Sequence, residues 1–124
     1  MVIDTTSELA SAYYASWQGG AGHFDEARLR GILAPDLEFD GPLAGHRVGA
    51  EGFLKGLADF AHRVMALRMV EQVYAGDQAA FMYDCDLVGG DKPMRFAEFL
   101  RSEHDRIQAI TLLYDKADFL SLTR

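Results

Sequence analysis

A change of hydrophobic period near Val64 most strongly constrains what this chain can fold into. Before that residue, apolar side chains recur at helical spacing, as in Leu9, Tyr13 and Trp17. After it, apolar and polar residues alternate, as they do in half-buried β-strands. Helices gathered in one half and strands in the other are typical of an α+β fold and not of a βαβ alternation. We therefore expect an α+β domain in which three N-terminal helices pack on a curved antiparallel sheet and enclose a pocket.

Capping and breaking residues predict where the first two helices begin and end. Thr5 and Glu8 form a capping-box pattern, and Gly19-Gly20 ends the helix that begins there. A second, short helix begins at Asp25 and ends at Pro35, because the residue before a proline avoids helical angles.

A short strand, a loop and a third helix complete the first half. Leu37–Asp40 alternates like a strand, and 45–49 has the composition of a loop. The third helix carries Phe53 on its apolar face. Gly52 and Gly56 lie on one side of this helix and lower its propensity, which predicts close packing of another backbone against them.

Four strands are expected after the change of period, at about 65–74, 79–88, 94–102 and 106–114. The connections at 76–77, 89–93 and 103–105 are short, so the strands form an antiparallel meander. Turn length sets register, and this register pairs Asp84 with Met69 on one side and with Glu98 on the other. One face then carries Leu67, Met69, Glu71, Met82, Asp84, Asp86, Phe96, Glu98, Ile110, Leu112 and Tyr114. The opposite face, with Val70, Tyr83, Cys85 and Phe99, is not polar either, so we expect a second copy of the chain to cover it.

Three carboxylates on the middle strands are the best candidates for chemistry. Asp84, Asp86 and Glu98 are expected to project into one hollow beside Met82 and Phe96. Like charges in a desolvated site raise the pKa of at least one member, which suits a general acid or base near neutral pH.

Other interpretations of these acids remain open from the sequence. The register could differ or the pocket mouth could be wet, or Arg68, Arg95 or His46 could neutralise the acids. A cation site is a third reading, although carboxylates alone hold hard ions weakly unless several converge. His46 itself either shuttles protons at the pocket or lies at the surface.

Composition excludes several classes of partner. The 124 residues suit one domain spanning 1–124, and the net charge of -7 with scattered Lys and Arg argues against nucleic acid and anionic membranes. The single cysteine, Cys85, cannot form an internal disulfide or a thiolate metal site. Neither signal peptide nor membrane span is apparent, so we expect a cytoplasmic protein. The four histidines lack metal-ligand spacing, and 19–22 is no phosphate loop, so we expect neither metal nor cofactor.

Several segments resemble one known family. Tyr13-Tyr14, Phe24-Asp25, the run from Leu33 to Phe39, the run from Gly45 to Gly49, and 104–115 are together similar to SnoaL-like proteins of the nuclear transport factor 2-like superfamily. The resemblance covers nearly the whole chain. It implies a cone-shaped sheet wrapped by helices, a deep pocket and a homodimer, while this superfold hosts many unrelated activities.

The resemblance also allows catalytic positions of two relatives to be compared. Tyr14 and Glu98 are similar to the tyrosine and the acid of ketosteroid isomerases, but Gly41 occupies the position of their base and Asp40 is one residue away. This departure argues against steroid isomerisation. Asp86 matches one aspartate of the epoxide hydrolases, but Asp84 and Leu112 stand where an arginine and a second aspartate are needed, which argues against that hydrolysis.

Two functions follow from these observations. The first is a protein that binds a small hydrophobic molecule, with a pocket that catalyses isomerisation, cyclisation or dehydration. Its catalytic candidates are Asp84, Asp86, Glu98, Tyr14 and His46, and its ligand-binding candidates are Tyr13, Trp17, Phe53, Met69, Met82, Phe96 and Leu112. The alternative is a noncatalytic dimeric module whose interface contains Val70, Tyr83 and Phe99.

Overall fold

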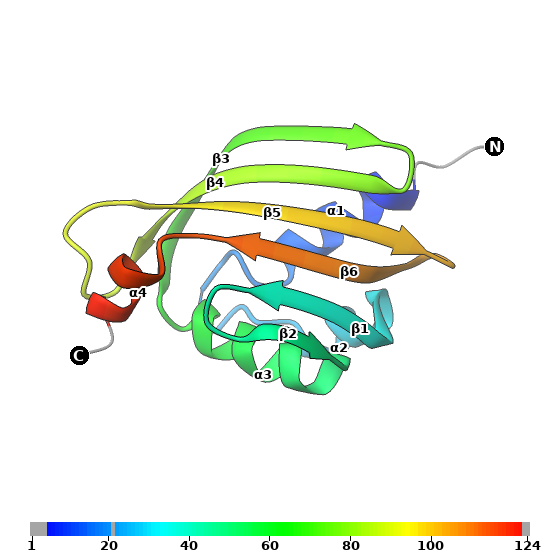
Figure 1. The fold of residues 1–124 in the computed structure, drawn as a ribbon, viewed down its shortest axis with the longest axis horizontal. Helices are drawn as coiled ribbons and strands as arrows, with labels where there is room; N and C mark the ends of the chain where they lie inside the picture. The colour runs from blue at the N-terminus through cyan, green and yellow to red at the C-terminus, as the bar shows by residue number, and fades with distance from the viewer. Residues whose placement is uncertain (1–4, 21, 123–124) are drawn as a thin grey trace.

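Six strands form one curved, unclosed sheet in the computed structural model, which describes residues 5–20 and 22–122 (Figure 1). The sheet order is β2-β1-β6-β5-β4-β3. The strands are β1 (Leu33–Gly41), β2 (Gly45–Val48), β3 (Val64–Ala75), β4 (Gln78–Leu87), β5 (Met94–Glu103) and β6 (Arg106–Leu113). The described helices are α1 (Thr5–Ala15), α2 (Glu26–Ile32), α3 (Ala50–Ala61) and α4 (Lys116–Leu122). Residues 1–4, on which the signal-peptide expectation partly depends, lie outside this range, as does Ala21 of the glycine-rich segment.

The α+β class and the helices of the first half are confirmed, with α1, α2 and α3 on one face of the sheet (Figure 1). Local chemistry explains α2: the Asp25 side chain accepts from the Arg28 backbone N–H at 3.0 Å, and Pro35 lies just beyond the last turn. The sequence did not predict α4, which follows the last strand. It also did not predict β2, because 45–49 was expected to be a loop and instead pairs antiparallel with β1.

The meander from β3 to β6 is confirmed, but its register differs from the expected one. Gly76-Asp77 forms the predicted two-residue turn, with Gly76 at φ +63°. The last hairpin turns at His104-Asp105, and a bulge after Arg101 shifts the pairing by one more residue. The two shifts add up to two residues, and an even shift leaves each side chain on the same face. Glu98 therefore lies opposite Leu112 and keeps its expected face.

Between β4 and β5 the shift is odd, which reverses the faces. Cys85 pairs with Met94, whereas the sequence predicted that Val88 would pair with it. The connection between the paired residues therefore extends beyond the predicted residues 89–93. Asp84 therefore lies opposite Arg95 and not opposite Glu98. A register change of an odd number of residues moves every side chain of a strand to the other face.

The core lies between the helices and the inner face of the sheet. Aromatic rings dominate it: Tyr13, Trp17, Tyr83 and Phe96 are all about 1% exposed. Bulges in β3 at Met65 and Val70 bend this strand, which lets the sheet curve around the helices. No described helix combines the length and apolarity that a bilayer span requires.

Candidate active site

Glu98 is buried beneath the first helix and held by three phenols. It projects inward from β5 and is 2% exposed. The phenol of Tyr13 donates to its Oε2 at 2.7 Å, and those of Tyr14 and Tyr83 donate to its Oε1 at 2.8 and 2.9 Å. A carboxylate accepts at about four lone-pair sites, so one further partner can be accommodated.

Three elements bring these groups together. Consecutive helical residues differ by about 100° in direction, so Tyr13 and Tyr14 approach the carboxyl group from α1 at two angles. Their rings meet edge to face, with centroids 5.0 Å apart. Tyr83 comes from β4, which is hydrogen-bonded to β5, and its ring stacks on Phe96 at 5.5 Å.

Burial and hydrogen bonding act in opposite directions on the acid. Burial raises the pKa of Glu98, and the hydrogen bonds from the three phenols partly offset this rise. Burial, together with the charge of Glu98, also raises the pKa of Tyr13 and of Tyr83 well above the ordinary value. The phenols therefore stay protonated as donors, and the carboxyl group is the member of the cluster that gains or loses a proton most readily.

A pocket of about 600 Å³ opens above this cluster. Its wall is mostly apolar and aromatic, and Glu98, Tyr13 and Tyr83 contribute to it. Four glycines also line it: Gly41, Gly49, Gly52 and Gly56. The volume lies in the range that small organic ligands occupy in proteins, and such pockets combine an apolar wall with a few polar groups.

Close packing against the glycines of α3 was predicted and is wrong. A Cβ atom added at Gly52 or Gly56 would meet nothing within 4 Å. Both residues line the pocket, so their missing side chains leave space for a ligand instead of admitting another backbone.

A family model for the SnoaL-like domain matches residues 10–110, which is most of the chain. The chain belongs to the SnoaL-like family. This family assignment agrees with the resemblance of the sequence segments and with the cone-like sheet seen here.

Solved structures show the same fold at low sequence identity. A protein from Kribbella flavida is 22% identical with a TM-score of 0.80, over 94% of this chain and 91% of that one. A nuclear transport factor 2-like protein of unknown function from Cytophaga hutchinsonii is 17% identical with a TM-score of 0.69, over 93% and 94%. A second Kribbella flavida protein, named as a candidate ketosteroid isomerase, is 19% identical with a TM-score of 0.74, over 91% and 79%. No curated protein sequence matches the chain.

Asp84 and Asp86 do not face the pocket of this SnoaL-like protein, so their expected orientation was wrong. Arg95 binds Asp84 with two hydrogen bonds of 2.8 and 3.0 Å, and Arg68 binds Asp86 with two of 2.9 Å, on the outer face of the sheet. Hydrogen bonding to these guanidinium groups lowers the pKa of both aspartates. This is the neutralised arrangement that the sequence left open as an alternative.

The odd shift in register explains the remaining errors on β4. Met82 shares the outer face with Asp84, while Tyr83 and Cys85 point into the core. Burial raises the pKa of the Cys85 thiol to about 12. Tyr83 thus belongs to the Glu98 cluster and cannot form part of an interface on the outer face, where the sequence placed it.

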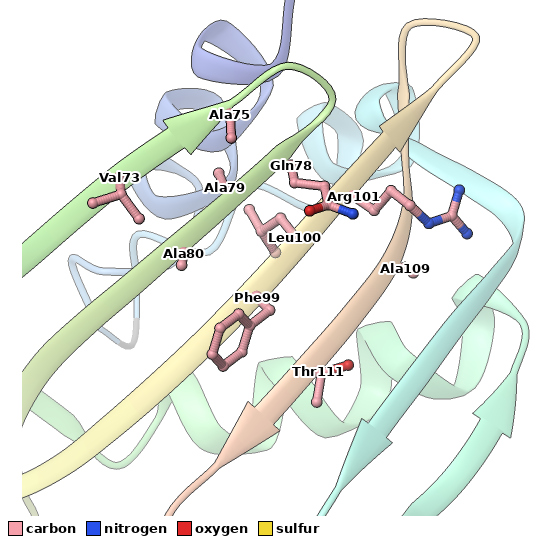
Figure 2. A pocket seen from close by; sticks show the side chains of 10 residues that line it. All are labelled: Val73, Ala75, Gln78, Ala79, Ala80, Phe99, Leu100, Arg101, Ala109 and Thr111. Carbon is pink, nitrogen blue, oxygen red and sulfur yellow. The ribbon is translucent and has the colours of Figure 1, made fainter.

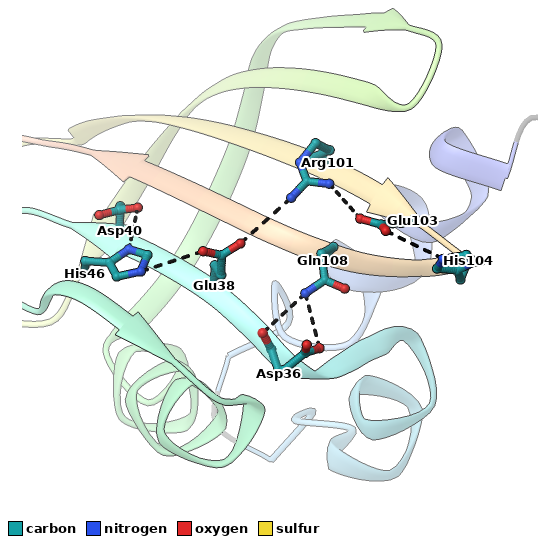
Figure 3. Close-up of polar contacts among 8 residues, drawn as sticks. All are labelled: Asp36, Glu38, Asp40, His46, Arg101, Glu103, His104 and Gln108. Carbon is teal, nitrogen blue, oxygen red and sulfur yellow. Dashed lines mark hydrogen bonds and ion pairs between the residues drawn. The ribbon is translucent and has the colours of Figure 1, made fainter.

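His46 lies on the outer surface of the β1–β2 hairpin and not in the pocket. Its Nδ1 is 3.1 Å from Asp40 and its Nε2 is 3.8 Å from Glu38, which in turn approaches Arg101 at 4.0 Å (Figure 3). Within the described ranges, no group of three His, Cys, Asp or Glu side chains is arranged to hold a metal ion.

The other predicted site residues divide into two groups. Five of the expected ligand-binding residues line the pocket: Tyr13, Trp17, Phe53, Phe96 and Leu112. Tyr14 reaches Glu98 but does not line the pocket, and Met69 packs against the core outside it. The sequence missed Tyr83, although the inward set on β4, from Ala79 to Leu87, is the more apolar of the two alternating sets, which favours it as the core face.

Proposed function

We propose that this protein binds a small apolar molecule and transfers a proton at the inner end of the pocket, with Glu98 as acid or base. The observation that carries the proposal is one buried carboxyl group, held by three phenols, in the wall of a mostly apolar pocket. Isomerisation, cyclisation and dehydration all need such a step. The structural neighbour named as a candidate isomerase supports the same class of chemistry, at a level of identity that establishes the fold alone.

One detail favours a ligand that brings a proton to this end of the pocket. Oε2 of Glu98 accepts from Tyr13 alone among the described residues, so it retains capacity for the proton of a ligand.

The mechanism uses the two protonation states of one group. Glu98 as carboxylate takes a proton from a carbon next to a carbonyl, and as carboxylic acid returns it to the same or a neighbouring carbon. The phenols fix the orientation of the carboxyl group, which positions it before the substrate arrives. Solvent exclusion by the aromatic wall strengthens these interactions.

Deuterium exchange of a reference ketone tests this step directly. 2-Decalone in deuterated buffer exchanges the protons next to its carbonyl, and NMR follows the rate. We expect the protein to accelerate exchange. Glu98→Gln should lose at least about 90% of the acceleration, because a positioned acid or base contributes about 100-fold or more. Asp84→Asn should retain the acceleration. Equal rates for the wild type and Glu98→Gln would exclude Glu98 as the proton carrier, and no acceleration despite binding would favour the noncatalytic alternative.

We further propose that the protein forms a homodimer through the outer face of the sheet. Val73 and Phe99 on this face are 60% and 48% exposed. They border a hollow of about 430 Å³, and Figure 2 shows Val73, Phe99 and Thr111 on the side of the sheet away from the helices. An exposed apolar face of this kind marks a contact surface.

A further inference from the structure

Two arginines that line the pocket have no carboxylate partner among the described residues. Arg47, on β2, and Arg63, between α3 and β3, both contribute to the pocket wall. Arg47 donates from Nε to the carbonyl oxygen of Ala44 at 3.0 Å. The guanidinium carbon of Arg63 lies 5.8 Å from the centre of the Phe119 ring, and this residue also lines the pocket.

These two residues differ from most of the other arginines that the structure describes. Five arginines have a carboxylate oxygen within 4.0 Å: Arg28, Arg30, Arg68, Arg95 and Arg101. Arg47, Arg63 and Arg106 have none among the described residues, and Arg106 contacts the backbone of Arg30 instead. Two of the three unpaired guanidinium groups therefore belong to one pocket, in a chain whose net charge is -7.

Position separates these cations from the buried acid. Arg47 is exposed and Arg63 is half-buried, whereas Glu98 is fully enclosed. The cations thus mark the solvent end of the pocket, and the acid marks its inner end. Among the described residues, Asp59 is the one further charged residue in the wall, so the solvent end carries two positive groups and one negative group.

From this separation, we propose that the natural ligand is an amphipathic acid. Its carboxylate or similar anionic group binds Arg47 and Arg63 at the mouth, and its apolar body extends inward to Glu98. Guanidinium groups pair with oxyanions through charge-assisted hydrogen bonds, and two of them near an apolar pocket select an anionic end group. This proposal rests on the proposed function and adds the chemical class of the ligand.

A pair of matched compounds tests the selectivity. 4-Cyclohexylbutanoate and 4-cyclohexylbutanamide share one apolar body and differ in the charge of the end group at pH 7. Trp17 is the single tryptophan of the chain and lines the pocket, so its fluorescence reports binding of both. We expect the acid to bind about two- to fivefold more tightly than the amide at low salt, because one partly exposed ion pair contributes up to about fivefold.

Three variants assign the effect. Arg47→Gln and Arg63→Gln should each reduce the preference for the acid and leave the affinity for the amide unchanged, whereas Arg106→Gln, at an unpaired arginine outside the pocket, should change neither. Equal binding of acid and amide by the wild type would overturn this inference, and so would an unchanged preference in both pocket variants. Neither result would contradict the proposed binding of an apolar molecule in the pocket. Binding of neither compound would overturn the proposed pocket, and the ligand class with it.

Discussion

Glu98 carries a proton-linked contribution to stability because folding raises its pKa. Burial favours the neutral carboxylic acid, so between its unfolded and folded pKa values the native state binds more protons than the unfolded state. The free energy of unfolding therefore falls as pH rises through this window. Each unit by which folding raises the pKa corresponds to about 1.4 kcal/mol lost by the upper end of the window.

A stability profile of Glu98→Gln tests this linkage. Relative to this variant, the wild type should lose stability as pH rises above about 4.3, the ordinary glutamate value, because only the wild type must ionise a buried group. Urea denaturation at a series of pH values measures the difference. Asp84→Asn is the control: since Arg95 lowers the pKa of Asp84, its contribution has the opposite sign and is lost as pH falls. Parallel profiles for wild type and Glu98→Gln would show that folding leaves the acid unperturbed.

Helix α3 shapes the pocket through its glycines, which place no side chain at the pocket wall. Its glycines reduce helix propensity, and the space beside them remains open to a ligand. The helix therefore gives up stability where the pocket requires room, which is a common pattern at functional sites.

Gly56→Ala should stabilise the protein by about 0.5–1 kcal/mol, because alanine is the better helix former and its methyl group meets no neighbour. Urea denaturation measures this gain. Gly20→Ala is the contrasting variant: Gly20 has a φ of +81°, and a Cβ there would lie 2.7 Å from the Val64 carbonyl oxygen, so it should destabilise. A loss of stability in Gly56→Ala would contradict the open space beside α3.

At the scale of the whole molecule, the two faces of the sheet differ in what surrounds them. The inner face and its helices enclose the pocket, while the outer face is apolar around Phe99 and carries the aspartate–arginine pairs beyond it. A second subunit on this face would bury its apolar side chains without disturbing Glu98, so assembly and catalysis are expected to be separable.

Phe99→Glu should convert the proposed dimer to a monomer, because it places a charge in the centre of the apolar patch. Analytical ultracentrifugation would show a mass near 13.7 kDa for the variant and twice that for the wild type. Val88→Glu introduces the same charge at another exposed apolar residue, in the β4–β5 connection, and should leave the dimer intact. A monomeric wild type at all concentrations would refute the interface.

The sequence alone determined the α+β class, the strand count after Val64, and the inward direction of Glu98. These features depend on hydrophobic period, capping residues and short turns, which are local properties of the chain. Helical spacing also placed Tyr13, Trp17 and Phe53 on apolar faces, and all three line the pocket in the structure.

Only the tertiary structure decided which acids face inward. The wide β4–β5 connection and the bulges changed the register by amounts that turn length does not reveal, and an odd change sent Asp84 and Asp86 outward and Tyr83 inward. The two unpaired arginines of the pocket likewise come from segments on either side of α3, and nothing in their local sequence indicates a common cavity. Local patterns specify elements, whereas a site is formed where distant elements meet, and that meeting depends on packing across the whole chain.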